Sequence, residues 1–456
     1  MSENNLSPED SAILASLPNL ESIDLLIADN NGLLRGKRIA RSALDKVYKQ
    51  GICLPFSVFG CNITGETSEQ TGLGFTTGDR DTICVPIPGS LQPIPWKGST
   101  HVQLMMTMLD DDGELFPGNA RVVLQSMLAR LKQQGLTPVI AVELEFFLFD
   151  KAFDDNGEPC APTHPLKNER DRDEQVYLME TLDAYEAFIQ DVKHYAQLQN
   201  VPADTATAEC GPGQFEINLL HTDDAVAACD QALMLKRIIK AVAAKHGYLA
   251  SFMAKPQAES VGSGTHVHIS LLDAAGNNVF ASPIGEPNET LLHALGGLQA
   301  SMADAMLLFA PHANSWRRFQ LDSYVSLNPC WGYNNRTVAL RIPTSDENNR
   351  RIEHRIAGAD ANPYLVTAAI LAGIHYGLTQ KLKPTAPITG NAYDQTEPTN
   401  PRQWQHALQL FDESNWIQAY FDSTFIKVFS AIKHDEIRLF EQKITPLEYH
   451  WYLNNV

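Results

Sequence analysis

The 456-residue sequence contains the run Val142-Glu-Leu-Glu-Phe-Phe-Leu-Phe149. In a β-strand, side chains alternate between the two faces, so Glu143 and Glu145 share one face while the apolar residues between and around them share the other. Two neighbouring carboxylates in an otherwise apolar strand repel each other and resist burial. A bound cation or a shared proton relieves that repulsion, whereas a solvated sheet face needs neither.

The same alternation of polar and apolar residues recurs in three further segments, two of them next to Gly-rich turns. A lone histidine pair is structural more often than it ligates a metal. Four separate strands with clustered polar faces instead favour one enclosed site lined by carboxylates, imidazoles and guanidiniums. The three further groups are Gln214, Glu216 and Asn218; His266, His268 and Ser270; and Arg351, Glu353 and Arg355.

The donor atoms of these segments are mostly carboxylate oxygens. Such a hard ligand set suits Mg²⁺ or Mn²⁺ rather than zinc or copper. Five carboxylates exceed what one ion needs, which predicts a site with two or more metal ions, and such sites serve phosphoryl transfer. The five are Glu143, Glu145, Glu209, Glu216 and Glu353, with one or two histidines beside them.

Residues 311–355 hold seven arginines and no lysine. The planar, bidentate contacts of arginine suit phosphate groups and a carboxylate substrate. A salt-bridged rim is the alternative, and it is the favoured interpretation for Arg317 and Arg350. The sequence has no Walker A loop, no GxGxxG and no nucleophile elbow, so any nucleotide is expected to bind in another way.

Composition and charge set the outer limits on function. An excess of 54 acidic over 35 basic residues, with a formal net charge of −19, argues against a surface for nucleic acid or an anionic membrane. A hydrophobic content of 44% excludes a disordered or fibrous protein. Seven scattered cysteines without a CxxC pair, and an acidic N-terminus, favour a cytoplasmic protein with reduced thiols. The sequence contains no run of 18 or more apolar residues, so it predicts no membrane-spanning helix.

The pattern of elements predicts an α+β fold. The first hundred residues read as a strand-rich module, and the turn signal Asp110-Asp-Asp-Gly113 places a boundary between 1–110 and 111–456. Beyond that turn, strands and helices mix without strict alternation. The predicted strands are 23–28, 51–59, 138–150, 267–272 and 337–342, and the predicted helices are 120–134, 223–246, 359–377, 403–411 and 416–433.

Together, the motifs resemble the glutamine synthetase family, in order and spacing, over nearly the whole chain. The resemblance implies an N-terminal β-grasp domain followed by a large catalytic domain. It also implies hexameric rings, doubled to a dodecamer, with active sites between neighbouring subunits. The matching motifs are Glu143-Leu-Glu145, Gly213-Gln-Phe-Glu216, Gly262-Ser-Gly-Thr-His266-Val-His268, Asn335-Arg336 with Arg341-Ile-Pro343, and Arg351-Ile-Glu353-His-Arg355.

The resemblance also implies a role for each matching residue in a ligase that uses ATP, glutamate and two or three Mg²⁺ (or Mn²⁺) ions per site. Arg336 and Glu353 are the implied catalytic residues. The implied binding sets are Glu145, Glu209 and Glu216 for the metal nearer the amino acid; Glu143, His266 and Glu353 for the metal at the ATP phosphates; His268, Arg341 and Arg351 for the nucleotide; Arg336 for the transferring phosphate; and Gly262, Arg318 and Arg355 for glutamate.

Two departures from the family pattern concern the amine substrate. Glutamine synthetases that use ammonium carry an aspartate directly after a phenylalanine in the first domain, whereas here Phe59 is followed by Gly60. They also carry a glutamate on a flap, where this sequence has Tyr324. Without the two anionic groups that gather NH₄⁺, the sequence is similar to the γ-glutamylpolyamine branch of the family, above all to its bacterial members that use putrescine.

The expected reaction is phosphorylation of glutamate by ATP, followed by attack of a neutral amine, with putrescine preferred. Glu66, Asp322 and Tyr324 are candidate groups for recognising the second ammonium of putrescine. For Glu66 and Asp322, an ordinary loop residue is the favoured interpretation. One alternative is a glutamine synthetase whose ammonium site is built from other residues. Another is a catalytically silent family member with a structural or regulatory role, although every metal ligand and substrate arginine of the motifs is present.

Overall fold

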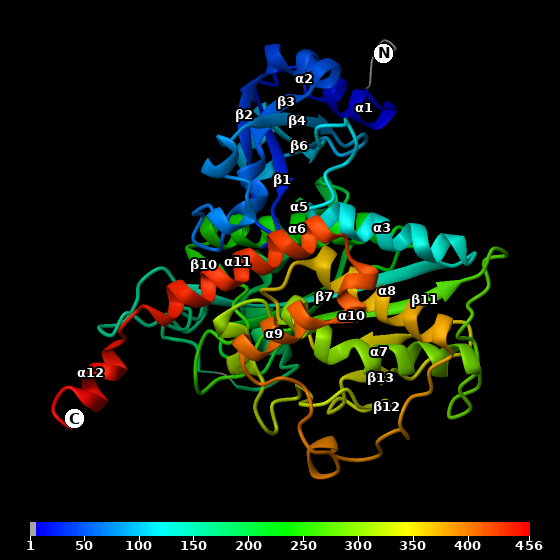
Figure 1. Ribbon diagram of the computed structural model, residues 1–456. Helices are drawn as coiled ribbons and strands as arrows, with labels where there is room; N and C mark the ends of the chain where they lie inside the picture. Colours follow the sequence, from blue (N-terminus) through cyan, green and yellow to red (C-terminus); the bar gives the residue numbers. More distant parts are fainter. Residues whose placement is uncertain (1–5, 173) are drawn as a thin grey trace.

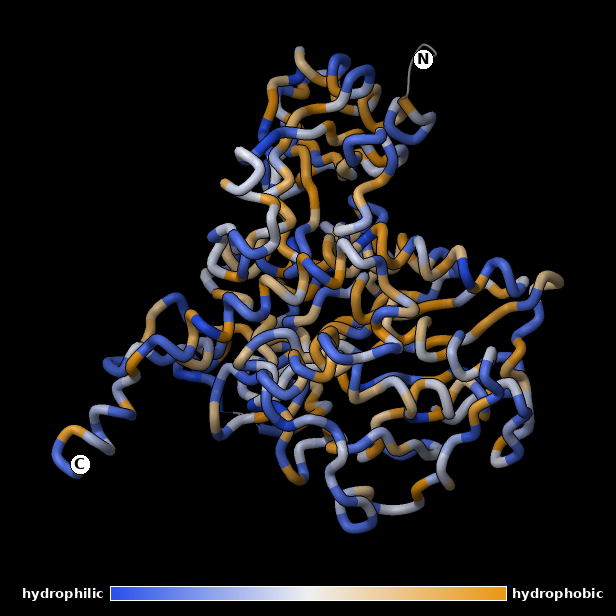
Figure 2. The backbone as a smooth tube through the Cα atoms, viewed as in Figure 1, coloured by the Kyte–Doolittle hydropathy of each residue, from blue (hydrophilic) through white to orange (hydrophobic). Residues whose placement is uncertain are grey.

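The computed structural model of the chain describes residues 6–172 and 174–456. It contains two β-sheets, each with its own hydrophobic core, and helices that cover them. The first sheet, drawn in blue, stands above the larger part of the molecule in Figure 1. Figure 2 shows apolar stretches gathered in the interior of both parts and polar stretches on the outer loops. The predicted α+β class is confirmed.

The first sheet has the strand order β2-β1-β6-β4-β3, with β5 paired to β6. Strands β1 and β6 run parallel at its centre, and the other neighbours are antiparallel, as expected for the β-grasp module. The strand predicted over 51–59 is shorter, because the chain turns into the 3₁₀ helix η2 (Phe56–Gly60). The elements are α1 (Pro8–Ser16), β1 (Ser22–Ala28), β2 (Leu34–Ala40), α2 (Leu44–Gln50), β3 (Ile52–Pro55), β4 (Asp81–Pro86), β5 (Gln92–Pro93) and β6 (His101–Met108).

The second sheet has the order β12-β13-β14-β11-β7-β9-β8, with β10 paired to β7. The strand predicted over 337–342 begins only at Leu340, because Asn335 Oδ1 accepts the backbone N–H of Thr337 at 2.9 Å and holds that segment in a turn. The strands are β7 (Thr137–Asp150), β8 (Ala203–Ala208), β9 (Gln214–Leu219), β10 (Tyr248–Ser251), β11 (Thr265–Leu272), β12 (Trp331–Tyr333), β13 (Leu340–Ile342) and β14 (Ile352–His354).

Strand β7 lies at the centre of the second sheet and shows the predicted alternation. Val142, Leu144 and Phe146 are fully buried on the side where helices α3 and α6 pack against the strand. Each such side chain contributes about 1.5–3 kcal/mol to folding when it leaves water. Glu143 and Glu145 are partly buried and therefore face the opposite side of the sheet, as predicted.

The helices cover the second sheet and form the C-terminal end of the chain. The helix predicted over 416–433 is two helices, because α10 ends at Tyr420 and Asp422 Oδ1 caps α11 by accepting the N–H of Thr424 at 2.7 Å. The helices are α3 (Ala120–Gln133), α4 (Met179–Ala184), α5 (Glu186–Leu198), α6 (Ala225–Lys245), α7 (Glu289–Phe309), α8 (Pro363–Gln380), α9 (Trp404–Glu413), α10 (Asn415–Tyr420), α11 (Ser423–Glu441) and α12 (Pro446–Tyr452).

Helix α7 is a core element that the sequence analysis missed. It is long and apolar enough to cross a membrane by length and composition, but 67% of that stretch is buried inside the protein, as in a core helix. It crosses α8 so closely that a Cβ on Gly297 would lie 2.1 Å from the carbonyl oxygen of Gly373. A glycine at position 297 therefore allows the two helices to cross this closely. The adjacent pair Gly296 and Gly297 also lowers the helix propensity of the segment, which is why it was not predicted as a helix.

Candidate active site

Four consecutive strands of the second sheet carry predicted site residues on one face. In the register of the sheet, Glu143 lies opposite His266, and Glu145 lies opposite Glu216. The next strand pair places His268 opposite Glu353. The structure thus brings together, from β9, β7, β11 and β14, the group Glu143, Glu145, Glu216, His266, His268 and Glu353.

Glu143 lies at the centre of this face. Its Oε1 is 2.8 Å from His268 Nε2, and its Oε2 is 3.2 Å from His266 Nδ1. Burial raises the pKa of the Glu143 carboxyl, but the hydrogen bonds from the two histidines outweigh burial and hold this pKa well below its usual range. Arg351 Nε donates to His268 Nδ1 at 3.1 Å, so the proton of that imidazole is on Nε2 and points at Glu143.

Glu353 is the most buried carboxylate of the face, with 1% exposure. It accepts hydrogen bonds from Arg341 Nη1 at 2.7 Å and from Arg355 Nη1. Burial raises the pKa of Glu353, but the neighbouring Arg355, His268 and His266 outweigh it and lower the pKa to about 2. The carboxylate therefore stays charged and fixes two arginines in place.

Glu209 and Glu216 have the opposite electrostatic environment. Burial and the charges of Glu143 and Glu145 raise the pKa of Glu216 to about 9. Burial and the charge of Glu145 raise the pKa of Glu209 to about 7. Within the part of the chain that the structure describes, neither carboxylate has an ion pair with lysine or arginine. Such an excess of carboxylates fits a site that binds cations.

Two groups of side chains have donor atoms close enough to hold one ion each. The atoms of Glu143, His268 and Glu353 lie within 4.8 Å of one another, as do those of Glu143, Glu216 and His266. Carboxylate and imidazole donors of this kind fit Mg²⁺ or Mn²⁺. His268, which the resemblance assigns to the nucleotide, thus also has a nitrogen in position to ligate a metal.

The Gly-rich turn before β11 makes room for Arg318. This arginine is 4% exposed, and its Nη1 donates to the carbonyl oxygens of Ile356 at 2.7 Å and Ala357 at 3.1 Å. A Cβ on Gly264 would lie 2.4 Å from Arg318 Nη2, and one on Gly262 would lie 2.7 Å from Arg318 Cγ. The two glycines are therefore required where the guanidinium passes the turn.

Arg336 lies apart from the sheet face, in the exposed turn between β12 and β13. It lines a cavity of about 530 Å³ together with Tyr324 and Asn335. Its positive charge partly offsets the rise in the pKa of Glu209 that burial and Glu145 cause. Arg336 is thus close enough to influence the carboxylates, but it makes no hydrogen bond to them among residues 6–172 and 174–456.

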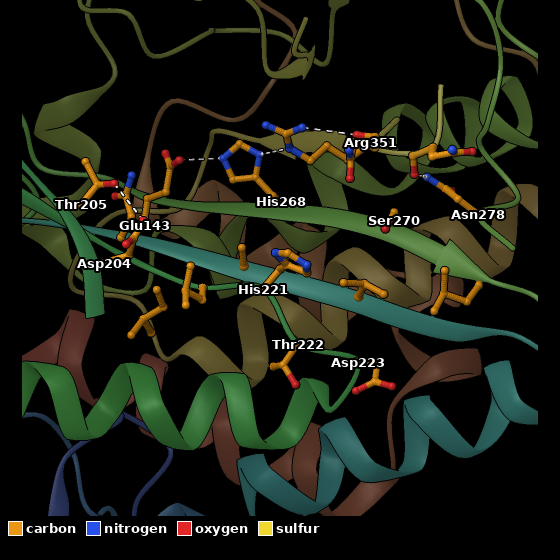
Figure 3. A pocket seen from close by; sticks show the side chains of 18 residues that line it. Glu143, Asp204, Thr205, His221, Thr222, Asp223, His268, Ser270, Asn278 and Arg351 are labelled. Atoms are coloured by element: carbon orange, nitrogen blue, oxygen red, sulfur yellow. Dashed lines mark hydrogen bonds and ion pairs between the residues drawn. The ribbon is translucent and has the colours of Figure 1, made fainter. Parts of the chain in front are cut away.

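A cavity of about 780 Å³ opens beside the polar face. Figure 3 shows Glu143, His268 and Arg351 in a row along its upper side, joined by hydrogen bonds. Its volume lies in the range of small-molecule sites. Several of its polar lining residues were not predicted from the sequence, although residues 220–223 directly follow β9, the strand that carries Glu216. These residues are Asp204, Thr205, His221, Thr222, Asp223 and Asn278.

One arginine was placed wrongly by the sequence analysis. Arg350 is not part of a salt-bridged rim, because it is 1% exposed and donates from Nη2 to the carbonyl oxygen of Ser282 at 2.9 Å. It fixes a loop in the interior instead. Arg317, the other arginine expected at a rim, is exposed.

The two positions that depart from the ammonium-using pattern have distinct environments. Gly60 is buried in η2, and a Cβ there would lie 2.9 Å from Thr71 Oγ1. A longer side chain at this position therefore requires Thr71 to move. Tyr324 is 61% exposed, with a φ of 58°, and lies on the rim of the cavity that contains Arg336.

The sequence matches a known protein family. The family model for the glutamine synthetase catalytic domain matches residues 117–452, and the chain belongs to the glutamine synthetase family. It is 45% identical over 442 residues to the γ-glutamylputrescine synthetase PuuA of Escherichia coli strain K12, a match that covers 97% of this chain and 93% of that protein.

Two further relatives agree with this assignment. The chain is 33% identical over 446 residues to a glutamate–isopropylamine ligase of a Pseudomonas species, covering 96% of this chain and 95% of that ligase. The solved structure of GmaS without ligand matches with a TM-score of 0.83 at 25% identity, covering 98% of this chain and 99% of that one. The predicted family and the predicted similarity to its polyamine branch are confirmed.

Proposed function

We propose that this chain uses ATP to join the γ-carboxylate of glutamate to an amine, with putrescine as the amine and γ-glutamyl phosphate as the intermediate. The observation that carries this proposal is the single sheet face on which carboxylates and imidazoles meet three arginines, Arg341, Arg351 and Arg355. Its relatives include a γ-glutamylputrescine synthetase and a glutamate–isopropylamine ligase, and both names describe an amine as the second substrate.

The chemistry requires activation of a poor acyl donor. Transfer of the γ-phosphoryl group to glutamate gives the carboxylate a leaving group, and attack by a neutral amine then releases phosphate. When bound, Mg²⁺ or Mn²⁺ neutralises the negative charge that gathers between ATP and glutamate. Glu353 holds Arg341 and Arg355 in fixed orientations, so these guanidiniums need little reorganisation as charge develops.

The proposed roles of the residues follow the family pattern. The donor atoms that lie within 4.8 Å of one another divide the metal ligands differently, as Glu143, His268 and Glu353 and as Glu143, Glu216 and His266. Metal ligation by Glu209 and Glu216 is supported by their place among other carboxylates, because burial and the neighbouring negative charges raise both pKa values and a bound cation would offset that repulsion. The sets are Glu145, Glu209 and Glu216 for the metal near glutamate; Glu143, His266 and Glu353 for the metal near ATP; His268, Arg341 and Arg351 for the nucleotide; Gly262, Arg318 and Arg355 for glutamate; and Arg336 with Glu353 as catalytic residues.

Preference for a larger amine over ammonium is supported by the absence of two carboxylates. Gly60 has no room for a side chain without a shift of Thr71. Tyr324 places an aromatic ring, whose face attracts an ammonium group, beside the cavity that contains Arg336. An enzyme built in this way has little to gather NH₄⁺ but leaves space for a diamine.

We further propose that the chain assembles into hexameric rings, doubled to a dodecamer. Helix α12 supports self-association, because it projects from the body of the molecule in Figure 1 and because its large apolar side chains are exposed. Leu447, Tyr449 and Trp451 are 52%, 54% and 54% exposed. Exposed apolar groups of this kind mark interaction surfaces.

The domain boundary at residue 110 and a cytoplasmic location are proposed on separate grounds. Strand β6 ends at Met108 and the next helix, α3, begins at Ala120, so the boundary falls in a connecting segment. All seven cysteines are free, which fits a reducing compartment.

Phosphate release from ATP in the presence of Mg²⁺ and glutamate tests the proposed function. Ammonium, putrescine and a monoamine are compared at equal concentrations, and the product is identified by mass. Strong stimulation by putrescine with little by ammonium is expected. Stimulation by ammonium alone would identify a glutamine synthetase, and no stimulation by any amine would favour a catalytically silent family member.

A further inference from the structure

Ser315 and Arg318 lie one turn apart on the short 3₁₀ helix η6 (Ala313–Arg318). Ser315 is 1% exposed, and its Oγ donates to Asp360 Oδ2 at 2.6 Å. The same oxygen accepts the backbone N–H of His312 at 3.0 Å. Asp360 belongs to the loop between β14 and α8, so this loop holds the helix that carries Arg318.

A second contact joins the same two segments. Arg318 Nη1 donates to the carbonyl oxygens of Ile356 and Ala357, which lie shortly before Asp360 in the loop. The loop is itself anchored, because Lys236 Nζ donates to the carbonyl oxygen of Ala359 at 2.6 Å. The loop thus contacts η6 at two places, through Ser315 and through Arg318 itself. Two contacts fix both the position and the rotation of the guanidinium, whereas one contact would leave it free to rotate.

Asp360 also supplies negative charge near the arginine. In the ranges that the structure describes, no carboxylate forms an ion pair with Arg318. Burial lowers the pKa of the Arg318 guanidinium, and the charges of Glu145 and Asp360 partly offset this. Asp360 Oδ1 is buried and accepts no hydrogen bond from the same part of the chain. Asp360 thus stabilises the charged arginine without occupying the N–H groups that a substrate carboxylate needs.

We propose that Asp360 is a positioning residue for glutamate: through Ser315 it sets the orientation of Arg318, whose remaining N–H groups receive a carboxylate of the substrate. This inference rests on the proposed function, because it takes glutamate as the ligand of Arg318. The sequence signal is weak, since Asp360 lies in a small-residue loop and its partner Ser315 is distant in the chain.

Steady-state kinetics of amine-dependent phosphate release by the full chain test this inference, with glutamate and ATP varied separately. Asp360→Asn keeps the size of the side chain and an acceptor for Ser315 but removes the charge, whereas Ser315→Ala removes the hydrogen bond. Each variant is expected to raise the KM for glutamate on the order of 10-fold, with kcat and the KM for ATP within about twofold of wild type.

A double variant and a matched control separate positioning from general stability. The Asp360→Asn/Ser315→Ala double variant is expected to be no worse than the worse single variant, because both changes act on one contact. Asp230→Asn is the control, since Asp230 accepts hydrogen bonds from Tyr364 and Arg121 away from η6. It is expected to leave the KM for glutamate unchanged.

An unchanged KM for glutamate in both single variants overturns the inference, as does an equal rise in the KM for glutamate and ATP. Should Asp360→Asn fail to fold, Ser315→Ala decides alone. An inactive wild type rejects the proposed function, and glutamate affinity measured by calorimetry then replaces KM. In that case, wild-type binding that Ser315→Ala weakens supports the inference, and an absence of binding overturns it.

Discussion

Two buried clusters of charged side chains in this molecule are built in opposite ways. In the sheet cluster, which comprises Glu143, Glu145, Glu209, Glu216, Glu353, His266 and His268, carboxylates predominate and two of them lack an ion-paired cation in the described ranges. In the helix cluster, Lys433 and Glu436 of α11 neutralise each other. Lys433 Nζ lies 2.8 Å from Glu436 Oε2 and 2.8 Å from Asn31 Oδ1, and Glu436 Oε1 accepts the N–H of Ile63 at 2.7 Å.

The difference distinguishes a charge cluster that stabilises the fold from one that binds a ligand. Burial raises the pKa of Glu436, but Lys433 and His312 outweigh it and lower this pKa to about 2, whereas the pKa of Glu216 rises to about 9. Because Asn31 and Ile63 belong to the part of the chain that forms the first sheet, the helix cluster ties that part to α11. The sheet cluster instead has more carboxylates than cationic partners, and bound cations would balance this excess of negative charge.

The largest expected effect is on catalysis. Glu216→Gln removes one carboxylate from the sheet cluster and is expected to lower amine-dependent phosphate release about 10³-fold, since a bound metal supplies several kcal/mol of charge stabilisation. Its unfolding midpoint in urea with EDTA is not expected to fall, because the Glu216 carboxyl has a pKa of about 9 without metal and is already neutral near pH 7, as glutamine is. Exposed Glu158 provides a control, Glu158→Gln. Full activity of Glu216→Gln would remove Glu216 from the metal site.

The helix cluster is expected to respond in the opposite sense. Lys433→Met keeps most of the side-chain volume but leaves the buried Glu436 carboxylate without its lysine partner, with the His312 imidazole still beside it at 3.6 Å. This loss is expected to cost about 3–5 kcal/mol of unfolding free energy. The folded fraction is expected to retain the wild-type kcat. Urea unfolding at a fixed protein concentration measures the loss, and Lys433→Met/Glu436→Leu is expected to recover most of it. Equal stability of Lys433→Met and wild type would contradict the contrast.

The pH dependence of the free energy of unfolding tests the same contrast. The pKa of Glu436 is about 2 in the folded protein, against an ordinary value of 4.5. A lowered carboxyl pKa stabilises the fold above pH 4.5, and this contribution is lost as the pH falls toward 2. The contribution is on the order of 3 kcal/mol. Glu436→Gln is expected to flatten the pH dependence of the unfolding midpoint between pH 4.5 and pH 2. An unchanged slope would show that other carboxyls cause this pH dependence.

Metal binding gives the smallest expected shift. Mg²⁺ at about 100 times its Kd is expected to stabilise the wild type by about 2.7 kcal/mol, because it binds the folded sheet cluster and not the unfolded chain. Lys433→Met is expected to gain the same increment, whereas Glu216→Gln gains less. Thermal unfolding with Mg²⁺ and with EDTA measures both increments. An equal gain in all three proteins would show that the ions bind elsewhere.

Several features of the structure were beyond the reach of sequence patterns. Helix α7 was missed, because its adjacent glycines reflect a close crossing with α8 that no local pattern encodes. Arg350 was assigned to a rim, although its partner is a backbone carbonyl distant in the chain. The pairing of Lys433 with Asn31 joins opposite ends of the sequence and has no local signature.

Local patterns in the sequence were sufficient to predict the alternation of β7, β9, β11 and β14 and the residue types that meet there, because side-chain direction in a strand follows from its period of two. They also identified the family, through motifs that match in order and spacing. Which of these charges are balanced cannot be predicted from such local patterns. The pKa of a buried carboxylate depends on partners that strand order and helix packing bring together. For that reason Glu353 and Glu216, alike in sequence, have pKa values of about 2 and about 9.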